Sequence, residues 1–331
     1  MSSILRPGQI LRGRVSTYSL VKELYKATDS GVVFLARNSQ QEKCIVKSVA
    51  NHWRLQNEAT ILKKYQETTP SLRPLLDEIQ EPAEPPSIVL KYLDADLLTE
   101  SNKERLSRPQ IKQVAKSILK ALLPLHRDGL VHTDIKLDNI FVRYGGTYNR
   151  FTTIQLGDCG GVVSADSDFA REGHYIGTAL SRSPEAALRL HWGTATDVWS
   201  FGNAVLSLLY GGNYHLFNPA IDGYGVDHKD YLFIALKRIY KFFGPFPQSY
   251  EDFGGPDFIS VVNIFNRKGP PEKPFHLVTT KEIPLADKKF ILKIMKMDPR
   301  DRPTVEQLLA DEWFTEKSED TRVPLKPENK T

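Results

Sequence analysis

The sequence predicts an α+β fold, with a small and mainly antiparallel β part first and a larger, mainly helical part after it. Short apolar runs separated by turn residues alternate between residues 18 and 49, which is typical of a meander of strands. Residues 108–126 carry apolar side chains at helical spacing, and residues 197–209 are strongly apolar, so both predict long helices. A chain of 331 residues suffices for one large domain or two lobes with a sizeable core.

Composition and charge exclude several classes of protein. Lys and Arg total 44 against 40 Asp and Glu, and a formal charge of +4 is too small and dispersed to indicate a nucleic-acid or membrane partner. The sequence contains no long uncharged apolar run, so it predicts no transmembrane helix. Residues 1–13 lack the apolar segment of a secretory signal. Cys44 and Cys159 are the only cysteines, so no disulfide framework is implied. We therefore expect the cytoplasm or the nucleus.

The N-terminal part is expected to contain several strands and one helix. Leu55, Ala59 and Leu62 recur at helical spacing, which predicts a helix over residues 55–64. A loop rich in Pro and Glu covers residues 80–86. The expected strands span residues 18–25, 32–37, 44–49, 72–79 and 87–90.

Two short polar motifs carry the chemistry. Residues 131–141 form a polar loop between apolar anchors, with Lys136 two residues after Asp134 and Asn139 five residues after it. An Asp-x-Gly that begins at Asp158 follows an apolar, strand-like run. Each aspartate alone would be an ordinary turn residue. Together the motifs supply a base, a cation and two oxygen ligands for metal ions.

These motifs resemble those of the protein kinases, whose catalytic loop reads H-R-D-L-x-x-x-N and whose metal-binding turn reads D-F-G. The resemblance implies a bilobal protein kinase fold that transfers phosphoryl groups from ATP with Mg²⁺. Asp134 would orient the substrate hydroxyl and accept its proton, and Lys136 would balance the phosphoryl charge. Asn139 and Asp158 would hold magnesium through oxygen atoms. Thr178 would contact Asp134 and Lys136.

The same resemblance implies a nucleotide site between the lobes. Lys47 closes a run that matches the family's V-A-I-K strand, and Glu58 stands where a helix glutamate holds that lysine. Asp96 would bond the ribose, or alternatively cap the helix that follows it. The residues implied to form the nucleotide site are Gly31, Val33, Ile45, Lys47, Glu58, Leu90, Lys91, Leu93, Asp96 and Phe141.

Several positions depart from the family pattern. Lys26 and Thr28 stand where the phosphate loop of the family has glycines, and Ile45 stands where a small residue usually covers adenine. Thr133 replaces an arginine of the catalytic loop, and Cys159 replaces the phenylalanine of the metal-binding turn. Two hypotheses follow: an active Ser/Thr protein kinase, or a catalytically weak kinase-fold module that binds nucleotide or partners. The active enzyme is favoured, because the groups implied to contact phosphate, acceptor or metal are all retained, namely Lys47, Glu58, Asp134, Lys136, Asn139 and Asp158.

Two side chains leave alternatives open. Cys159 either lies partly reachable at the floor of a cleft or is a buried, inert thiol. Tyr175 either carries a phosphate that pairs with Arg182, or merely packs within a segment that is ordered without modification.

The rest of the chain fits the same resemblance. Asp197 is expected to pin the backbone of the catalytic loop, and Arg302 to pair with Glu185. Lys136 and Thr178 stand at positions that resemble the pattern of Ser/Thr kinases. Proteins with Ser or Thr acceptors are therefore the expected substrates. The pattern is closest to the group of cyclin-dependent, mitogen-activated and dual-specificity tyrosine-regulated kinases. In that group a segment like residues 243–276 is an interaction platform, although a plain surface loop would have a similar composition.

The expected domain organisation has four parts. A polar tail without fixed structure is indicated by its charged, Pro-containing composition. The parts are an N-terminal extension at 1–16, an N-lobe at 17–93, a C-lobe at 94–314 and the tail at 315–331.

Overall fold

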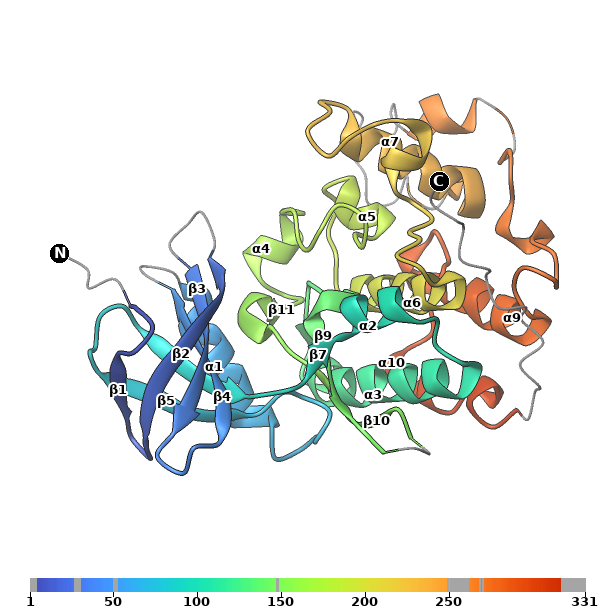
Figure 1. The fold of residues 1–331 in the computed structure, drawn as a ribbon. Coiled ribbons are helices and arrows are strands. Elements are labelled where there is room, and N and C mark those ends of the chain that lie inside the picture. The colour runs from blue at the N-terminus through green and yellow to red at the C-terminus, as the bar shows by residue number, and fades with distance from the viewer. Residues whose placement is uncertain are drawn as a thin grey trace.

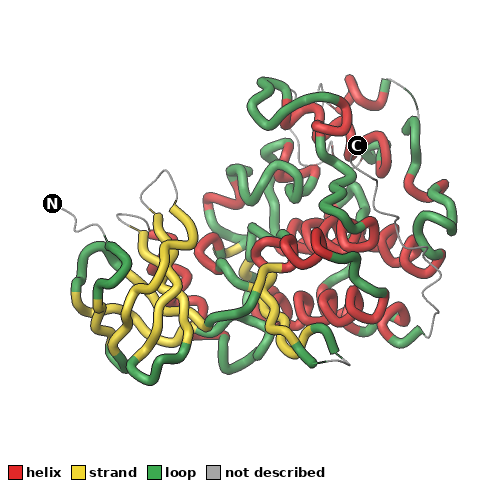
Figure 2. The backbone as a smooth tube through the Cα atoms, in the orientation of Figure 1, coloured by secondary structure: helices red, strands yellow, loops and turns green. Residues whose placement is uncertain are grey.

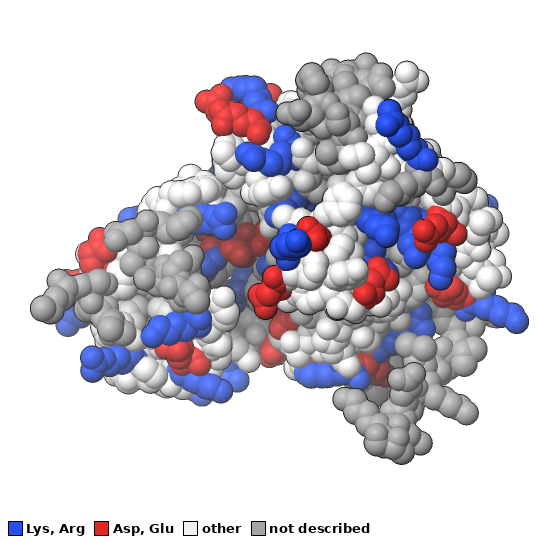
Figure 3. All heavy atoms as spheres, turned by 90° about the horizontal axis from the view of Figure 1, so that it is seen from above, with Lys and Arg blue, Asp and Glu red and all other residues white. Residues whose placement is uncertain are grey.

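The computed structural model describes residues 5–26, 31–49, 53–146, 149–248, 250, 262–267, 269 and 271–316. The chain forms two lobes, a strand-rich one from its N-terminal part and a larger, mainly helical one from the remainder (Figures 1 and 2). The predicted α+β class is therefore confirmed. Seen from above, a hollow separates the lobes, and acidic and basic side chains lie inside it (Figure 3).

The small lobe is a closed antiparallel barrel with the strand order β1-β2-β3-β4-β6-β5. Its interior is filled by alternate side chains, among them Leu20, Phe34 and Val46, as the period of two in the sequence requires. The strands are β1 Ile10–Gly13, β2 Thr17–Lys26, β3 Gly31–Asn38, β4 Lys43–Val49, β5 Leu75–Glu81 and β6 Ser87–Lys91. The strand expected over 72–79 thus begins later, at Leu75.

The barrel starts earlier than the expected boundary at residue 17, because β1 pairs with both β2 and β5. Asp77, a buried carboxylate in β5, explains this arrangement. It accepts hydrogen bonds from the backbone N–H of Val15 at 2.9 Å and of Ser16 at 3.2 Å, and from the hydroxyl of Tyr18 at 2.9 Å. These bonds fasten the β1–β2 turn to the barrel, so residues 10–13 belong to the lobe.

One helix, α1 (Trp53–Tyr65), joins the barrel to the large lobe. Leu55, Ala59 and Leu62 are buried on one face, as their spacing predicts, and Glu58 is buried with them. The amide of Asn57 donates to the carbonyl oxygens of Gly160 at 3.1 Å and Val162 at 2.8 Å, which lie in the large lobe. The helix is thus held against the segment that contains the Asp-x-Gly motif.

The large lobe is built around α3 (Arg108–Arg127) and α6 (Thr194–Tyr210). Ser107 and Gln110 form a capping box that begins α3. Helix α6 is mostly apolar and is buried along almost its whole length. The other helices are α2 Leu97–Lys103, α4 Asp168–Arg171, α5 Pro184–Ala187, α7 Tyr231–Phe243, α9 Leu285–Ile294 and α10 Val305–Leu309.

Short strands line the boundary between the lobes. A sheet with the order β10-β9-β7 carries the polar loop and the Asp-x-Gly motif at its strand ends. The strands are β7 Ala95–Asp96, β8 Leu130–Val131, β9 Ile140–Tyr144, β10 Phe151–Leu156 and β11 Val163–Ser164, and β8 pairs with β11.

Three expectations fall wholly or partly outside the described residues: the glycine replacement at Thr28, most of the tail 315–331, and much of the segment 243–276. No helix within the described residues is long and apolar enough to cross a membrane.

Candidate active site

Three charged groups meet where the two lobes face each other. Lys47, on β4, donates to the carboxylate of Glu58 on α1 and to that of Asp158, each at 2.7 Å. Burial lowers the pKa of the Lys47 amine, but the charges and hydrogen bonds of Glu58 and Asp158 outweigh it, so the pKa is raised. Lys47 is therefore a fixed cation that ties both lobes to one point.

Asp158 adopts an unusual backbone conformation. Its φ of 58° lies in the left-handed region, which aspartate tolerates better than most residues. Burial raises the pKa of the carboxyl group, yet the Lys47 ammonium and its hydrogen bond hold that pKa below the usual value. With 40% of its side chain exposed, the charged carboxylate points one oxygen at Lys47 and leaves the other free for a ligand.

The catalytic loop is suspended from α6. The carboxylate of Asp197, itself buried, accepts from the backbone N–H of His132 at 2.7 Å and of Thr133 at 2.9 Å. The ring of His126 lies 2.9 Å from the same carboxylate. The expectation that Asp197 pins this loop is confirmed. His132 is fully buried and its ring nitrogen lies 3.2 Å from the carbonyl oxygen of Gly157, which is a structural role.

Asp134, Lys136 and Asn139 converge at the end of this loop. The amide nitrogen of Asn139 donates to the Asp134 carboxylate at 2.9 Å, and the Lys136 ammonium lies 3.3 Å from it. The other carboxylate oxygen of Asp134, Oδ1, is buried and has no hydrogen-bond partner within the described residues. A buried acceptor without a donor is unfavourable, so this oxygen suits a hydroxyl group supplied by a ligand.

The donor set fits magnesium. Because the amide nitrogen of Asn139 faces Asp134, its oxygen is left available, and Asp158 keeps one carboxylate oxygen. Mg²⁺ prefers oxygen ligands and is commonly held by one or two side chains together with substrate phosphates. No cluster of three or more His, Cys, Asp or Glu that could hold a metal occurs in the described parts of the chain. The two residues would therefore hold the ion jointly with a nucleotide.

The implied nucleotide contacts lie around the same point. In the sheet register, Val33 is opposite Lys47 and Ile45 is opposite Leu90. Leu93 is buried after β6, and Gly31 opens β3. Phe141 is half-buried on β9, and Lys91 ends β6. These positions surround the cleft side of Lys47, and their nucleotide roles remain predictions.

Asp96 caps α2, one of its two alternatives. Its carboxylate accepts from the backbone N–H and the hydroxyl of Thr99, both at 2.8 Å. The ribose contact stays a prediction.

The implied contact of Thr178 with Asp134 and Lys136 stays a prediction. The hydroxyl of Thr178 lies 2.9 Å from that of Ser181, and no hydrogen bond joins Thr178 to either residue among those described. Gly177, with a φ of 57°, takes the place beside Asp134, since a Cβ there would lie 2.7 Å from the carbonyl oxygen of Thr133.

The side chain of Arg182 is already engaged in contacts within the same segment. It donates to the carbonyl oxygens of Ile176 at 2.8 Å and Gly177 at 3.2 Å, and its guanidinium lies 4.5 Å from the ring centre of Tyr175. The segment is thus held by an unmodified Tyr175, which favours ordering without a phosphate.

Cys159 is fully buried, so the expectation of a partly reachable thiol is wrong and the inert alternative holds. Burial raises the pKa of the thiol well above its usual value, and the Glu58 and Asp158 carboxylates add to the effect. The Lys47 ammonium opposes this effect but does not outweigh it.

We expect Cys159 to resist alkylation in the folded protein, with and without nucleotide, because the thiolate is both inaccessible and disfavoured. Mass spectrometry after a short exposure to iodoacetamide measures this. The urea-unfolded chain, labelled at both Cys44 and Cys159, is the control; labelling of Cys159 in folded protein would contradict the burial.

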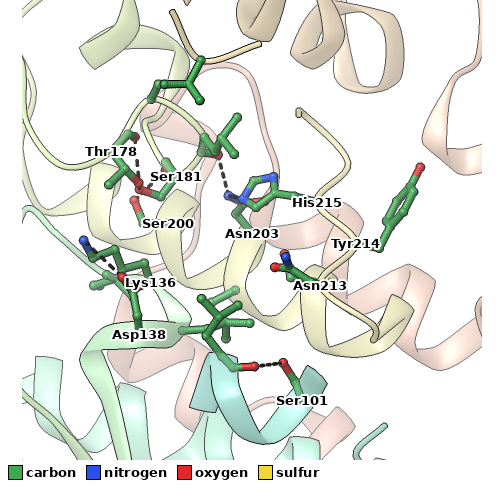
Figure 4. Close-up of a pocket in the computed structure, with 18 of the residues that line it drawn as sticks. Ser101, Lys136, Asp138, Thr178, Ser181, Ser200, Asn203, Asn213, Tyr214 and His215 are labelled. Atoms are coloured by element: carbon green, nitrogen blue, oxygen red, sulfur yellow. Dashed lines mark hydrogen bonds and ion pairs between the residues drawn. The ribbon is translucent and has the colours of Figure 1, made fainter. Parts of the chain in front are cut away.

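Beside the catalytic loop lies a cavity of about 370 Å³. Lys136, Asp138 and Thr178 line its side towards Asp134, and Asn203 and His215 lie across from them (Figure 4). Burial lowers the pKa of His215 to about 4, so this ring is neutral. Lys136, which lines the cavity, also lies 3.3 Å from the Asp134 carboxylate.

The comparisons with known proteins agree with this geometry. The protein kinase domain family matches residues 27–314. The serine/threonine-protein kinase US3 homolog of varicella-zoster virus (strain Dumas) is 28% identical over 213 residues, which are 64% of this chain and 52% of that protein. Serine/threonine-protein kinase PAK 5 of Rattus norvegicus is 33% identical over 125 residues, 38% of this chain and 17% of that protein. The human PAK 4 is 28% identical over 155 residues, 46% and 25% of the two chains. This chain spans about half, or less, of these relatives.

Proposed function

The chain belongs to the protein kinase domain family, and we propose that it is an active kinase that transfers the γ-phosphoryl group of ATP to Ser or Thr hydroxyls of proteins. The observation that carries the proposal is the pairing of Lys47 with both Glu58 and Asp158, opposite the group of Asp134, Lys136 and Asn139. These contacts support roles for Lys47 as a cation for the phosphates, for Asn139 and Asp158 as oxygen ligands of a metal, and for Asp134 as the base for the acceptor.

Phosphoryl transfer requires an in-line nucleophile and neutralised phosphate charge. Asp134 would orient the acceptor hydroxyl and take its proton through the unpartnered oxygen, and Lys136 would balance charge on the transferring group. Lys47 would hold the α- and β-phosphates. Magnesium, when bound, would neutralise phosphate charge at Asn139 and Asp158.

The second hypothesis, a catalytically weak module, is less well supported. Thr133 replaces the usual arginine, yet its backbone is held by Asp197 and its hydroxyl donates to Gly161 at 3.0 Å. Cys159 replaces phenylalanine but is buried in the same core cluster as Leu55 and Leu62. Both replacements alter packing and leave the charged groups in place.

The finer assignments are also proposals. Lys136 and the Gly177–Thr178 pair support Ser/Thr acceptors, and the named relatives are Ser/Thr kinases. The likeness to the cyclin-dependent and mitogen-activated group stays a prediction, because the relatives above are US3 and PAK kinases. A protein partner at residues 243–276 and a location in the cytoplasm or nucleus are likewise proposed from sequence alone.

Transfer of radiolabelled phosphate to a generic Ser/Thr protein substrate, with Mg²⁺ and ATP, tests the function. Asp134→Asn is the matched blank, because it preserves shape and removes the base. Label in Ser or Thr with wild type, but not with the blank, is the expected result; equal incorporation by both would refute the assignment of Asp134. Nucleotide binding without transfer would favour the weak module.

Activity is expected not to depend on Tyr175 phosphorylation. Tyr175→Phe keeps the ring over Arg182 and removes only the hydroxyl, so its rate should match that of phosphatase-treated wild type. Arg182→Met should be much slower, since the carbonyl oxygens of Ile176 and Gly177 lose their donor. A kinase assay on the three proteins decides; a strong loss on phosphatase treatment, shared by Tyr175→Phe, would show a phosphate switch instead.

A further inference from the structure

An arginine contacts two of the residues implied to form the nucleotide site. Arg73, between α1 and β5, donates from Nε to the carbonyl oxygen of Lys91 at 2.8 Å. Its guanidinium carbon lies 4.3 Å from the centre of the Phe141 ring. Lys91 and Phe141 are two of the residues predicted to contact the base, and Arg73 bridges them. The sequence gives no signal for this, because an arginine in a loop normally reads as solvated surface.

The backbone and one glycine fix Arg73 there. Its N–H donates to the carbonyl oxygen of Leu156 at 2.8 Å, and the N–H of Leu156 donates to Ser71 at 2.8 Å, so two segments are locked together. A Cβ on Gly157 would lie 2.8 Å from Phe141 and 3.4 Å from the Arg73 side chain. Only glycine at 157 leaves room for the guanidinium to lie against this ring.

Arg73 carries donors that nothing in the described protein uses. It is 8% exposed, and within the described residues only its Nε has a hydrogen-bond partner and no carboxylate pairs with it. Burial lowers the pKa of the guanidinium to about 10, although the charges of Glu58 and Asp158 oppose this, so the group stays protonated at neutral pH. The two terminal nitrogens have no hydrogen-bond partner among the described residues, so they are available to a ligand that presents an acceptor.

We propose that Arg73 reads position 6 of the purine, so that the site accepts 6-oxo purine nucleotides, GTP and ITP, as phosphoryl donors alongside ATP. This inference rests on the proposed function. Adenine presents an amino group at that position, so a donor would face the Arg73 donors. That amino group would also have to share the Lys91 carbonyl oxygen with Nε of Arg73. Guanine and hypoxanthine present a carbonyl oxygen, an acceptor that a guanidinium matches, as arginine does with guanine in DNA grooves.

The chemical step with GTP is the one proposed for ATP. The bond between the γ-phosphorus and the β-bridging oxygen breaks, a bond to the Ser or Thr oxygen forms, the hydroxyl proton passes to Asp134, and GDP leaves. Only recognition of the base changes, and it is remote from the reacting atoms. Arg73 is therefore a specificity-determining residue and not a catalytic one.

The test compares kcat/KM for ATP, ITP and GTP in wild type, Arg73→Met and Arg73→Lys. ITP differs from ATP at position 6, and GTP adds a 2-amino group, so ITP isolates the contact. In Arg73→Met, whose side chain still covers Phe141, the ITP/ATP and GTP/ATP ratios should each fall by about tenfold or more. Arg73→Lys should retain part of the preference, since it keeps a cation but loses the fork. Arg12→Met, on the exposed rim of the barrel, should leave both ratios unchanged.

Binding of the same nucleotides, measured by calorimetry with Mg²⁺, separates this inference from the function. Phosphotransfer with ATP, but ratios that Arg73→Met leaves unchanged, would overturn the inference alone. Base-selective binding that depends on Arg73, without transfer, would overturn the proposed function alone. Should Arg73→Met fail to fold, wild type decides: strong rejection of both ITP and GTP would sink the inference.

Discussion

Asp158→Asn is expected to reduce kcat by at least about a hundredfold, because it removes a charge that serves both Lys47 and the metal. Asparagine is the sharper choice than alanine here. It tolerates the left-handed conformation at φ 58° and keeps the shape of the side chain, so the turn is preserved. A radiolabel transfer assay under saturating ATP and Mg²⁺ measures the loss.

Asp301→Asn is a matched control, because Asp301 is exposed and the substitution removes the same charge outside the cleft. If Asp158→Asn retains a substantial share of the wild-type rate in well-folded protein, the metal role of Asp158 is wrong. Lys47→Met would be a less clean probe, because it leaves Glu58, 1% exposed, without its cation and so risks the fold as well as the activity.

Arg302→Met should lower the free energy of unfolding by about 3–5 kcal/mol. Its guanidinium forms two parallel hydrogen bonds to Glu185, at 2.7 and 2.8 Å, and both side chains are at most 1% exposed. The substitution leaves a buried carboxylate without a partner, and it removes donors from the carbonyl oxygens of Ala195, Lys296 and Met297. Urea denaturation followed by circular dichroism measures the change.

Two further variants make this result specific. Arg302→Met combined with Glu185→Leu removes both charges and should recover part of the loss. Arg127→Met breaks an ion pair to Glu306 whose side chains are 61% and 69% exposed, and should cost at most about 1 kcal/mol. A loss for Arg302→Met no larger than that of Arg127→Met would mean that the buried pair does not stabilise the fold.

The sequence predicts a contact between two side chains where local periodicity or a family motif fixes the position of both. Lys47 ends a strand and Glu58 lies on the buried face of a helix, so their pairing follows once the two elements pack. The pairs Arg302–Glu185 and Asp197–Thr133 follow similarly from family motifs.

Other features depend on how segments far apart in sequence meet, and the sequence does not reveal them. Strand β1 joins the barrel because the buried Asp77, which is 62 residues from Val15, holds the turn after it. Arg73 enters the cleft because Gly157 leaves space beside Phe141. Gly177 lies beside Asp134 because a Cβ there would come within 2.7 Å of the carbonyl oxygen of Thr133. In each case the position of one segment depends on the hydrogen bonds of a residue far from it in sequence, or on the absence of a side chain there.

The suspension of the catalytic loop from α6 bears on how this protein opens and closes in solution. Amide protons bonded to a group on a buried core helix exchange with solvent only when that core comes apart. The amides of His132 and Thr133 donate to Asp197, on a helix buried along almost its whole length. Their exchange is therefore coupled to global unfolding, whereas Lys47 belongs to a separate barrel. The half of the site that contains Asp134 should therefore keep its shape until the large lobe itself unfolds.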